Sequence, residues 1–260
     1  MTQFRTLPPF GGDPRQVSEV VRGVMDGKTN NTGRITLATG NATTTTLNDE
    51  RIGFDSLIFL VPVSNAANND SAPYGAFQSL VDQSITANTA TAMTLDTTDY
   101  SSGVYLSNSS RMNVRNAGIY NLQWSGQFQN TDSQLHDVTV WLRKNGTDIV
   151  GSAGFISIPN SHGGVNGHLI AGWNYFLELS ANDYIEIYWS ATNAAISLEF
   201  YPAGTSPTRP TTASLITTLN YVSPNASSNI YVSSQQQGSA TLTHWSNNTA
   251  NKTYGYIVVG

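Results

Sequence analysis

Residues Ala117 to Phe128 read Ala-Gly-Ile-Tyr-Asn-Leu-Gln-Trp-Ser-Gly-Gln-Phe, and this stretch decides the fold class. Small or polar residues separate most of its large apolar residues, which are Tyr120, Leu122, Trp124 and Phe128. Apolar side chains at every second position are typical of a β-strand with one buried face. The stretch therefore predicts a half-buried strand whose four large side chains enter a core.

Two downstream segments share this alternation. Val138 to Gly146 carries apolar residues into an Asn-Gly pair, which is a strong short signal for a hairpin turn. Leu177 to Trp189 places two alternating strands around Asn182 and Asp183. The predicted core positions of these segments are Val140, Leu142, Leu177, Ile185, Ile187 and Trp189.

The order of these motifs resembles a known family. The chain reads Gly-Ile-Tyr-x-Leu-x-Trp, then Val-x-Val-x-Leu-Arg-Lys-Asn-Gly, then Leu-x-Leu-x-x-x-Asp-x-Ile-x-Ile-x-Trp, as in the C1q/tumour-necrosis-factor-like jelly roll. The resemblance covers about residues 73 to 222. It implies a compact antiparallel sandwich that assembles as a homotrimer. The chain differs from animal members because it has no collagen-like Gly-x-y stalk.

Composition narrows the class of protein. Charged residues make up 11% of the 260 positions, against about 25% in ordinary soluble domains, and Thr, Asn and Ser supply the missing polarity. Such a composition favours strands and turns over helices. The net charge of -5 and the scattered Lys and Arg residues argue against nucleic acid as a partner.

Other classes are excluded by what the sequence lacks. The chain has no cysteine, which excludes disulfides and thiol catalysis. It has no apolar run of about 18 residues, and its N-terminus lacks the apolar core of a signal peptide, so we expect neither a membrane partner nor export by that route.

The first 12 residues predict an extended arm, because consecutive prolines disfavour a helix. The arm can be a peg that inserts into a neighbouring protein, or a tail that packs on its own domain or is disordered. The candidate anchoring residues are Phe4, Leu7, Pro8, Pro9 and Phe10.

A short helix is predicted next. Asp13 can cap it, Pro14 suits its first position, and Gln16 completes a capping box. An apolar stripe follows at helical spacing, formed by Val17, Val20, Val21 and Val24. A helix of this length is marginal alone in water, so its stripe must pack, either around a threefold axis or onto its own sheet.

The two ends of the chain each predict three short strands. The first three are 34–39, 43–47 and 57–63, and the last of these is apolar throughout and predicted to be central. The C-terminal three are 229–233, 239–244 and 253–259. Neither group makes a stable core alone. We therefore expect one discontinuous β domain of residues 13–66 plus 225–260, interrupted by the jelly roll of residues 67–224.

These outer segments carry a second resemblance. The pattern Thr-Thr-Thr-Thr-Leu-x-Asp-x-Arg-Ile-Gly, then Ile-Phe-Leu-Val-Pro-Val, and near the end Gly-Ser-x-Thr-Leu-Thr-His and Tyr-Ile-Val-Val-Gly, is similar to a module in structural proteins of tailed bacteriophages. The resemblance implies a component of the virion, in which such halves are often joined directly.

Recognisable catalytic and metal-binding motifs are absent from the sequence. His162 and His168 lie in a Gly-rich stretch that is better explained as a loop, and His244 is expected to be packed or solvent-facing. The Asp96/Asp99 pair and Asp70 fit no EF-hand spacing. We therefore expect no catalytic residue, no metal and no cofactor.

Exposed aromatic residues can serve recognition, but most of those here lie on alternating strand positions, so a core or a subunit interface is expected. Loops 155–167 and 203–212 are better candidates for contact with a receptor. The aromatic residues considered are Trp141, Trp173, Tyr184, Tyr188, Trp189 and Tyr201.

The sequence thus predicts an all-β chain with three parts: an arm at 1–12, a split β domain and an inserted jelly-roll knob. The expected function is non-enzymatic: a homotrimeric decoration or short fibre, such as a head fibre, at the surface of a tailed phage virion. Its partners would be copies of itself and the major capsid or tail proteins. The alternative is a tail receptor-binding protein, such as a tail fibre, that recognises a host cell-surface glycan.

Overall fold

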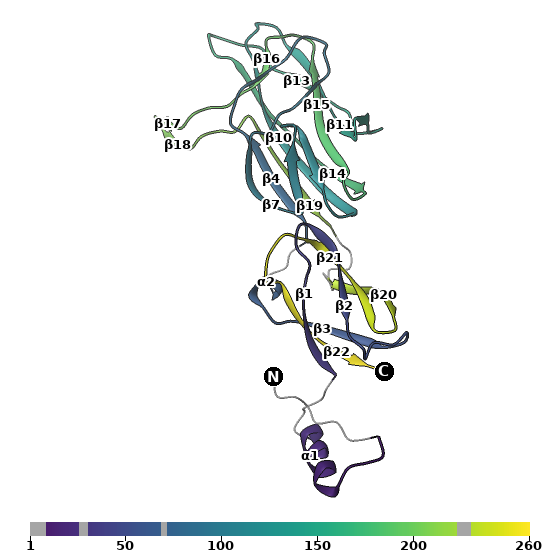
Figure 1. Ribbon diagram of the computed structural model, residues 1–260. Coiled ribbons are helices and arrows are strands. Elements are labelled where there is room, and N and C mark those ends of the chain that lie inside the picture. Colours follow the sequence, from purple (N-terminus) through teal and green to yellow (C-terminus); the bar gives the residue numbers. More distant parts are fainter. Residues whose placement is uncertain (1–8, 26–30, 69–71, 223–229) are drawn as a thin grey trace. The chain divides into compact units, whose positions relative to one another are not determined.

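The computed structural model describes residues 9–25, 31–68, 72–222 and 230–260. The chain is all-β in character, with 57% of its residues in strands and 7% in helices. It divides into two compact units. The outer unit joins residues 1–70 to residues 230–260, and the insert unit comprises residues 71–229 (Figure 1).

The insert unit is built from two seven-stranded antiparallel sheets. Sheet I has the order β5 (Gln83–Ser84), β16 (Ile196–Leu198), β10 (Gly118–Asn130), β19 (Leu215–Tyr221), β4 (Tyr74–Ser79) and β7 (Thr97–Ser102), and β14 (Gly167–Leu179) pairs with the other side of β10. Sheet II has the order β12 (Thr147–Asp148), β11 (His136–Lys144), β15 (Tyr184–Ala191), β9 (Arg111–Val114) and β8 (Val104–Ser107), with β13 (Gly154–Ile158) on β11 and β6 (Thr91–Ala92) on β15.

The inner faces of sheets I and II form one core, as their alternation requires. The Phe128 ring on β10 and the Trp189 ring on β15 pack with centroids 5.9 Å apart, which joins the two sheets. Tyr120 is buried, and its hydroxyl donates a 2.8 Å hydrogen bond to the Asn116 carbonyl. Burial raises the pKa of this phenol above its ordinary value. All ten residues predicted from the alternation for this core are buried in it.

Two turns that the sequence predicts hold each other at one end of sheet II. Asn145 and Gly146 have φ of 51° and 81°, as a two-residue hairpin turn between β11 and β12 requires. Asn182, in the turn between β14 and β15, also has a positive φ. Asn145 Nδ2 donates to Asp183 Oδ1 over 2.7 Å, and Lys144 Nζ lies 3.1 Å from Asp183 Oδ2.

The outer unit contains two three-stranded sheets, and each combines strands from both ends of the chain (Figure 1). Sheet III has the order β1 (Thr32–Thr36), β22 (Thr253–Val259) and β3 (Leu57–Pro62). Sheet IV has the order β2 (Ala42–Asn48), β21 (Ser239–Asn247) and β20 (Ile230–Gln236). A shared apolar cluster lies between them, with Leu47 and Leu242 from sheet IV and Tyr256 and Val258 from sheet III.

The prediction that 57–63 forms a central strand was wrong. β3 is at the edge of sheet III, and β22 is central. Ile58 and Leu60 pack against the core, whereas Leu57, Phe59 and Val61 point to the opposite face and are exposed. A strand that is apolar on both faces is predicted to lie in the centre of a sheet with both faces buried. In β3 the described residues bury only the face of Ile58 and Leu60.

The helix α1 spans Pro14–Met25 and has the predicted capping box. Asp13 Oδ1 accepts hydrogen bonds from the backbone N–H groups of Arg15 and Gln16, at 2.8 and 2.9 Å. No residue of α1 is buried, and Val17, Val21 and Val24 of its valine stripe are between 38% and 54% exposed. A second, four-residue helix, α2 (Asn65–Asn68), follows β3 and was not predicted.

Candidate interaction surfaces

The outer face of sheet I is nearly free of charge. The strands of this sheet contain Asp99 and Glu178 as their acidic residues and no Lys or Arg. Register places neutral polar residues in rows across the face: Asn121 lies between Phe176 and Asn220, and Gln123 lies between Asn174 and Thr218. Little desolvation energy would oppose the burial of such a face.

Apolar side chains stand among these neutral residues. The register places them all on the outer face, and each is between 37% and 71% exposed: Tyr74, Tyr100, Ile119, Ile170, Phe176 and Ile216. Aromatic enrichment and a lack of charge are the compositional marks of a protein interface core. Among the described strands, the 13-residue β14 pairs with β10 alone, so one long edge of the sheet is open.

The outer face of sheet II is largely covered by its own side chains, although Phe155 on β13 is 82% exposed. The Arg143 guanidinium lies 3.9 Å from the Tyr188 ring centroid, Arg111 lies 4.4 Å from Tyr184, and Arg115 lies 4.3 Å from Tyr105. These stacks place the aromatic faces beneath cations rather than in the solvent.

Carboxylates fix two of these arginines. Asp148 pairs with Arg143 and accepts a 2.7 Å hydrogen bond from Trp141 Nε1, and these two donors lower the pKa of the Asp148 carboxyl. Glu186 is only 4% exposed; it accepts a 2.7 Å hydrogen bond from Ser110 and lies 3.4 Å from Arg111 Nε. Sheet II therefore presents a closed network of charges and rings.

The aromatic residues for which a core or a subunit interface was predicted occupy different environments. Trp189 enters the core. Trp141, Tyr184 and Tyr188 instead lie half-buried on the outer face of sheet II. Trp173 is half-exposed on β14 and stacks on Tyr175, with ring centroids 6.1 Å apart.

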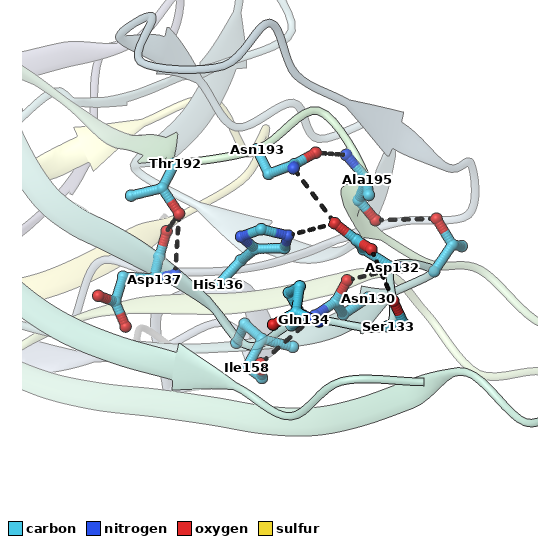
Figure 2. A network of polar contacts seen from close by, with 11 residues as sticks. Asn130, Asp132, Ser133, Gln134, His136, Asp137, Ile158, Thr192, Asn193 and Ala195 are labelled. Atoms are coloured by element: carbon cyan, nitrogen blue, oxygen red, sulfur yellow. Dashed lines mark hydrogen bonds and ion pairs between the residues drawn. The ribbon is translucent and has the colours of Figure 1, made fainter. Parts of the chain in front are cut away.

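A histidine–aspartate pair lies in the loop between β10 and β11 (Figure 2). His136 Nε2 donates to Asp132 Oδ2 over 2.7 Å, and Asn193 Nδ2 approaches the same oxygen at 3.4 Å. The hydrogen bond from His136 lowers the pKa of the Asp132 carboxyl. Sequence reasoning missed this pair, although an Asp four residues before a His is a local signal.

This pair holds two loops together. The Thr131 amide and hydroxyl both reach the Ala195 carbonyl, and Asn130 Nδ2 donates 2.8 Å to the Gln134 carbonyl (Figure 2). The nearby Ser133 hydroxyl donates to Asp132 rather than to the imidazole. The contacts of this pair are those of a loop brace, and they give no serine the activating hydrogen bond that nucleophilic catalysis uses.

The other polar candidates have structural partners. His244 is buried, which is the packed one of its two predicted environments, and its Nε2 lies 2.8 Å from Thr45 Oγ1. Asp96 accepts from the Leu80 amide, and Asp99 accepts from Gln78 Nε2 over 2.7 Å. His168 Nδ1 lies 3.4 Å from the Tyr201 hydroxyl. Within the described ranges, no three His, Cys, Asp or Glu residues group as a metal site.

The predicted anchoring residues are only partly described. Phe4, Leu7 and Pro8 lie outside the described residues. Pro9 and Phe10 are exposed. In the part of the chain that the structure describes, no helix combines the length and the apolarity that a membrane span needs. Asp70 also lies outside the described residues.

In comparisons with known proteins, no family model and no curated protein matched this chain. The surfaces themselves are therefore the basis for any functional argument.

Proposed function

We propose that this chain is a non-enzymatic structural protein of a tailed phage virion, a homotrimeric decoration or short fibre at the virion surface. Its insert unit would be a C1q/TNF-like jelly roll that projects as a knob. The arm and the valine-striped helix would anchor it to major capsid or tail proteins.

The outer face of sheet I carries this proposal. It combines neutral amide and hydroxyl rows with six exposed apolar residues. On the other face of the same sandwich arginines stack on three tyrosine rings, and Phe155 is the large apolar side chain that stays exposed on its strands. The order β7–β4–β19–β10–β14 in that sheet is also compatible with the jelly roll that the motif order implies. Trimerisation through this face is the assembly that both observations favour.

The test is the solution mass of the full chain by light scattering over a dilution series, together with two variants. We expect three times the chain mass of 28.0 kDa. Phe176→Asp would bury an unpaired carboxylate in the proposed interface, which costs about 2 kcal/mol or more per contact. The variant should therefore dissociate at concentrations at which the wild type remains trimeric.

Phe155→Asp is the matched control. Phe155 is equally large and even more exposed, and it lies on β13 at the outer face of sheet II. This variant should remain trimeric. A monomeric wild type, or equal dissociation of both variants, would refute the proposal. Mass spectrometry of purified virions tests the assignment to the particle, and absence of the chain from them would refute it.

One observation favours a tail receptor-binding protein as the second candidate. The hairpin of β17 (Gly204–Thr205) and β18 (Thr208–Arg209) stands away from the sandwich of the insert unit (Figure 1). Arg209 lies 5.9 Å from the Tyr201 ring centroid at its base, a combination that suits a sugar. Binding on a glycan array that is lost in Tyr201→Ala would support this function, and an array without signal would count against it.

A further inference from the structure

A second apolar face lies in the outer unit, on the side of sheet III away from its core. Register sets Leu57 opposite Val259 and Phe59 opposite Ile257, so these four residues share one face. Val61 continues it opposite Gly255. The sequences of β3 and β22 contain no Asp, Glu, Lys or Arg. The part of this face formed by β3 and β22 is therefore apolar and uncharged, and Arg34 of β1, opposite Gly255, lies at its margin.

The size of this face is that of a protein interface. Six large apolar residues of β3, β22 and the adjoining Val63 are between 38% and 61% exposed on this face: Leu57, Phe59, Val61, Val63, Ile257 and Val259. At about 200 Å² for a fully exposed large residue, they expose on the order of 600 Å². A standard interface buries about 800 Å² per partner, and about 600 Å² is the upper end of the apolar patches that monomeric proteins leave in water.

We infer that a second copy of this chain covers the outer face of sheet III. This inference rests on the proposed homotrimer, because all parts of a symmetric trimer share one threefold axis. Three copies held together through sheet I would keep their three outer units at a high effective concentration around one another. The three apolar faces would then bury one another before a separate protein could occupy them.

Other occupants are possible outcomes of the test. Most of the valine stripe of α1 is exposed among the described residues, and it could dock on the sheet III face of its own chain. A capsid protein could dock there as well. In neither case would the faces of two copies meet.

The absence of cysteine from the chain permits a clean experiment. Ile257→Cys places one thiol on the proposed interface, and Thr44→Cys places one on an exposed position of β2 in sheet IV. Each purified full-length variant is treated with a short bismaleimide, and its mass is measured by light scattering beforehand. Phe59→Cys, at the cross-strand neighbour of Ile257, repeats the test at a second position.

We expect the Ile257→Cys and Phe59→Cys variants to form covalent pairs of chains, up to two of every three chains, and at least tenfold more than the Thr44→Cys variant. A trimer without preferential cross-linking would overturn this inference and leave the proposed function standing. A dimer that cross-links at position 257 would keep the interface and refute the trimer. A monomer would refute both.

Discussion

The two outer faces of the insert sandwich differ in how far their aromatic and apolar side chains are shielded from water. Sheet II covers its aromatic rings with Arg111, Arg115 and Arg143, and it neutralises two of these cations with Glu186 and Asp148. Sheet I has no Lys or Arg in its strands and leaves Phe176 and Ile170 in the solvent. The difference is that sheet II covers most of its outer aromatic rings with its own arginines, whereas the apolar residues on the outer face of sheet I have no such cover; a partner for sheet I is part of the proposal.

The largest expected effect concerns the apolar core between sheets I and II. Trp189→Ala should cost about 3–5 kcal/mol of unfolding free energy, because the fully buried indole packs against Phe128 across the sandwich and its loss leaves a cavity. Urea unfolding monitored by circular dichroism checks this. A loss below about 1 kcal/mol would mean that the two sheets are not packed as described.

The next effect distinguishes the two outer faces. Glu186→Ala should cost about 2–3 kcal/mol, because it leaves the Ser110 hydroxyl without its buried acceptor and the Arg111 guanidinium without its ion-pair partner. The comparable change on sheet I, Glu178→Ala, removes an exposed carboxylate and should cost less than about 0.5 kcal/mol. Equal losses in urea unfolding would contradict the closed network assigned to sheet II.

A smaller effect is expected from exposing aromatic rings on sheet II, as the apolar residues of sheet I are exposed. Arg143→Ala uncovers Tyr188 and Trp141, and it should lower the unfolding free energy by about 1 kcal/mol. Binding of a hydrophobic fluorescent dye to the folded protein should rise. Unchanged dye binding would show that the guanidinium does not shield these rings.

The smallest effect is a difference in acid sensitivity. The pKa of Asp148 is lowered by Arg143 and Trp141, so its stabilising contribution is present above its ordinary pKa of 3.8 and is lost as pH falls through the lower folded pKa. The unfolding midpoint of the wild type should therefore fall below pH 4 more than that of Asp148→Asn. Parallel pH profiles of the two proteins would exclude Asp148 as a contributor.

Local alternation could predict much of this fold, because a strand with one buried face repeats every two residues. Tyr120, Leu122 and Trp124 are buried for this reason, and the Asn145-Gly146 turn follows from local backbone preference. β3 shows the limit of such reasoning. Apolar residues on both faces of a strand predict that both faces are buried, but they do not say which segment covers each face. The face with Leu57, Phe59 and Val61 is therefore predicted to lie in the interior, although it is exposed in the structure.

The remaining features depend on contacts between distant residues. Arg111 and Tyr184 are far apart in the sequence, and only the β9–β15 pairing brings them together. The shielding of Tyr188 by Arg143 likewise requires the β11–β15 register. No local pattern distinguishes an aromatic residue that is stacked beneath an arginine from one that is free to bind a sugar.

The pairing of both chain ends in sheets III and IV also sets an order of events during synthesis. The hydroxyls of Thr36 and Thr253 meet at 2.9 Å although 217 positions separate them, so β1 leaves the ribosome long before its partner exists. The insert unit finds its strand partners within residues 71–229 and can fold while the C-terminus is still being translated. The outer unit closes last, because sheets III and IV both need strands that follow the insert in the sequence.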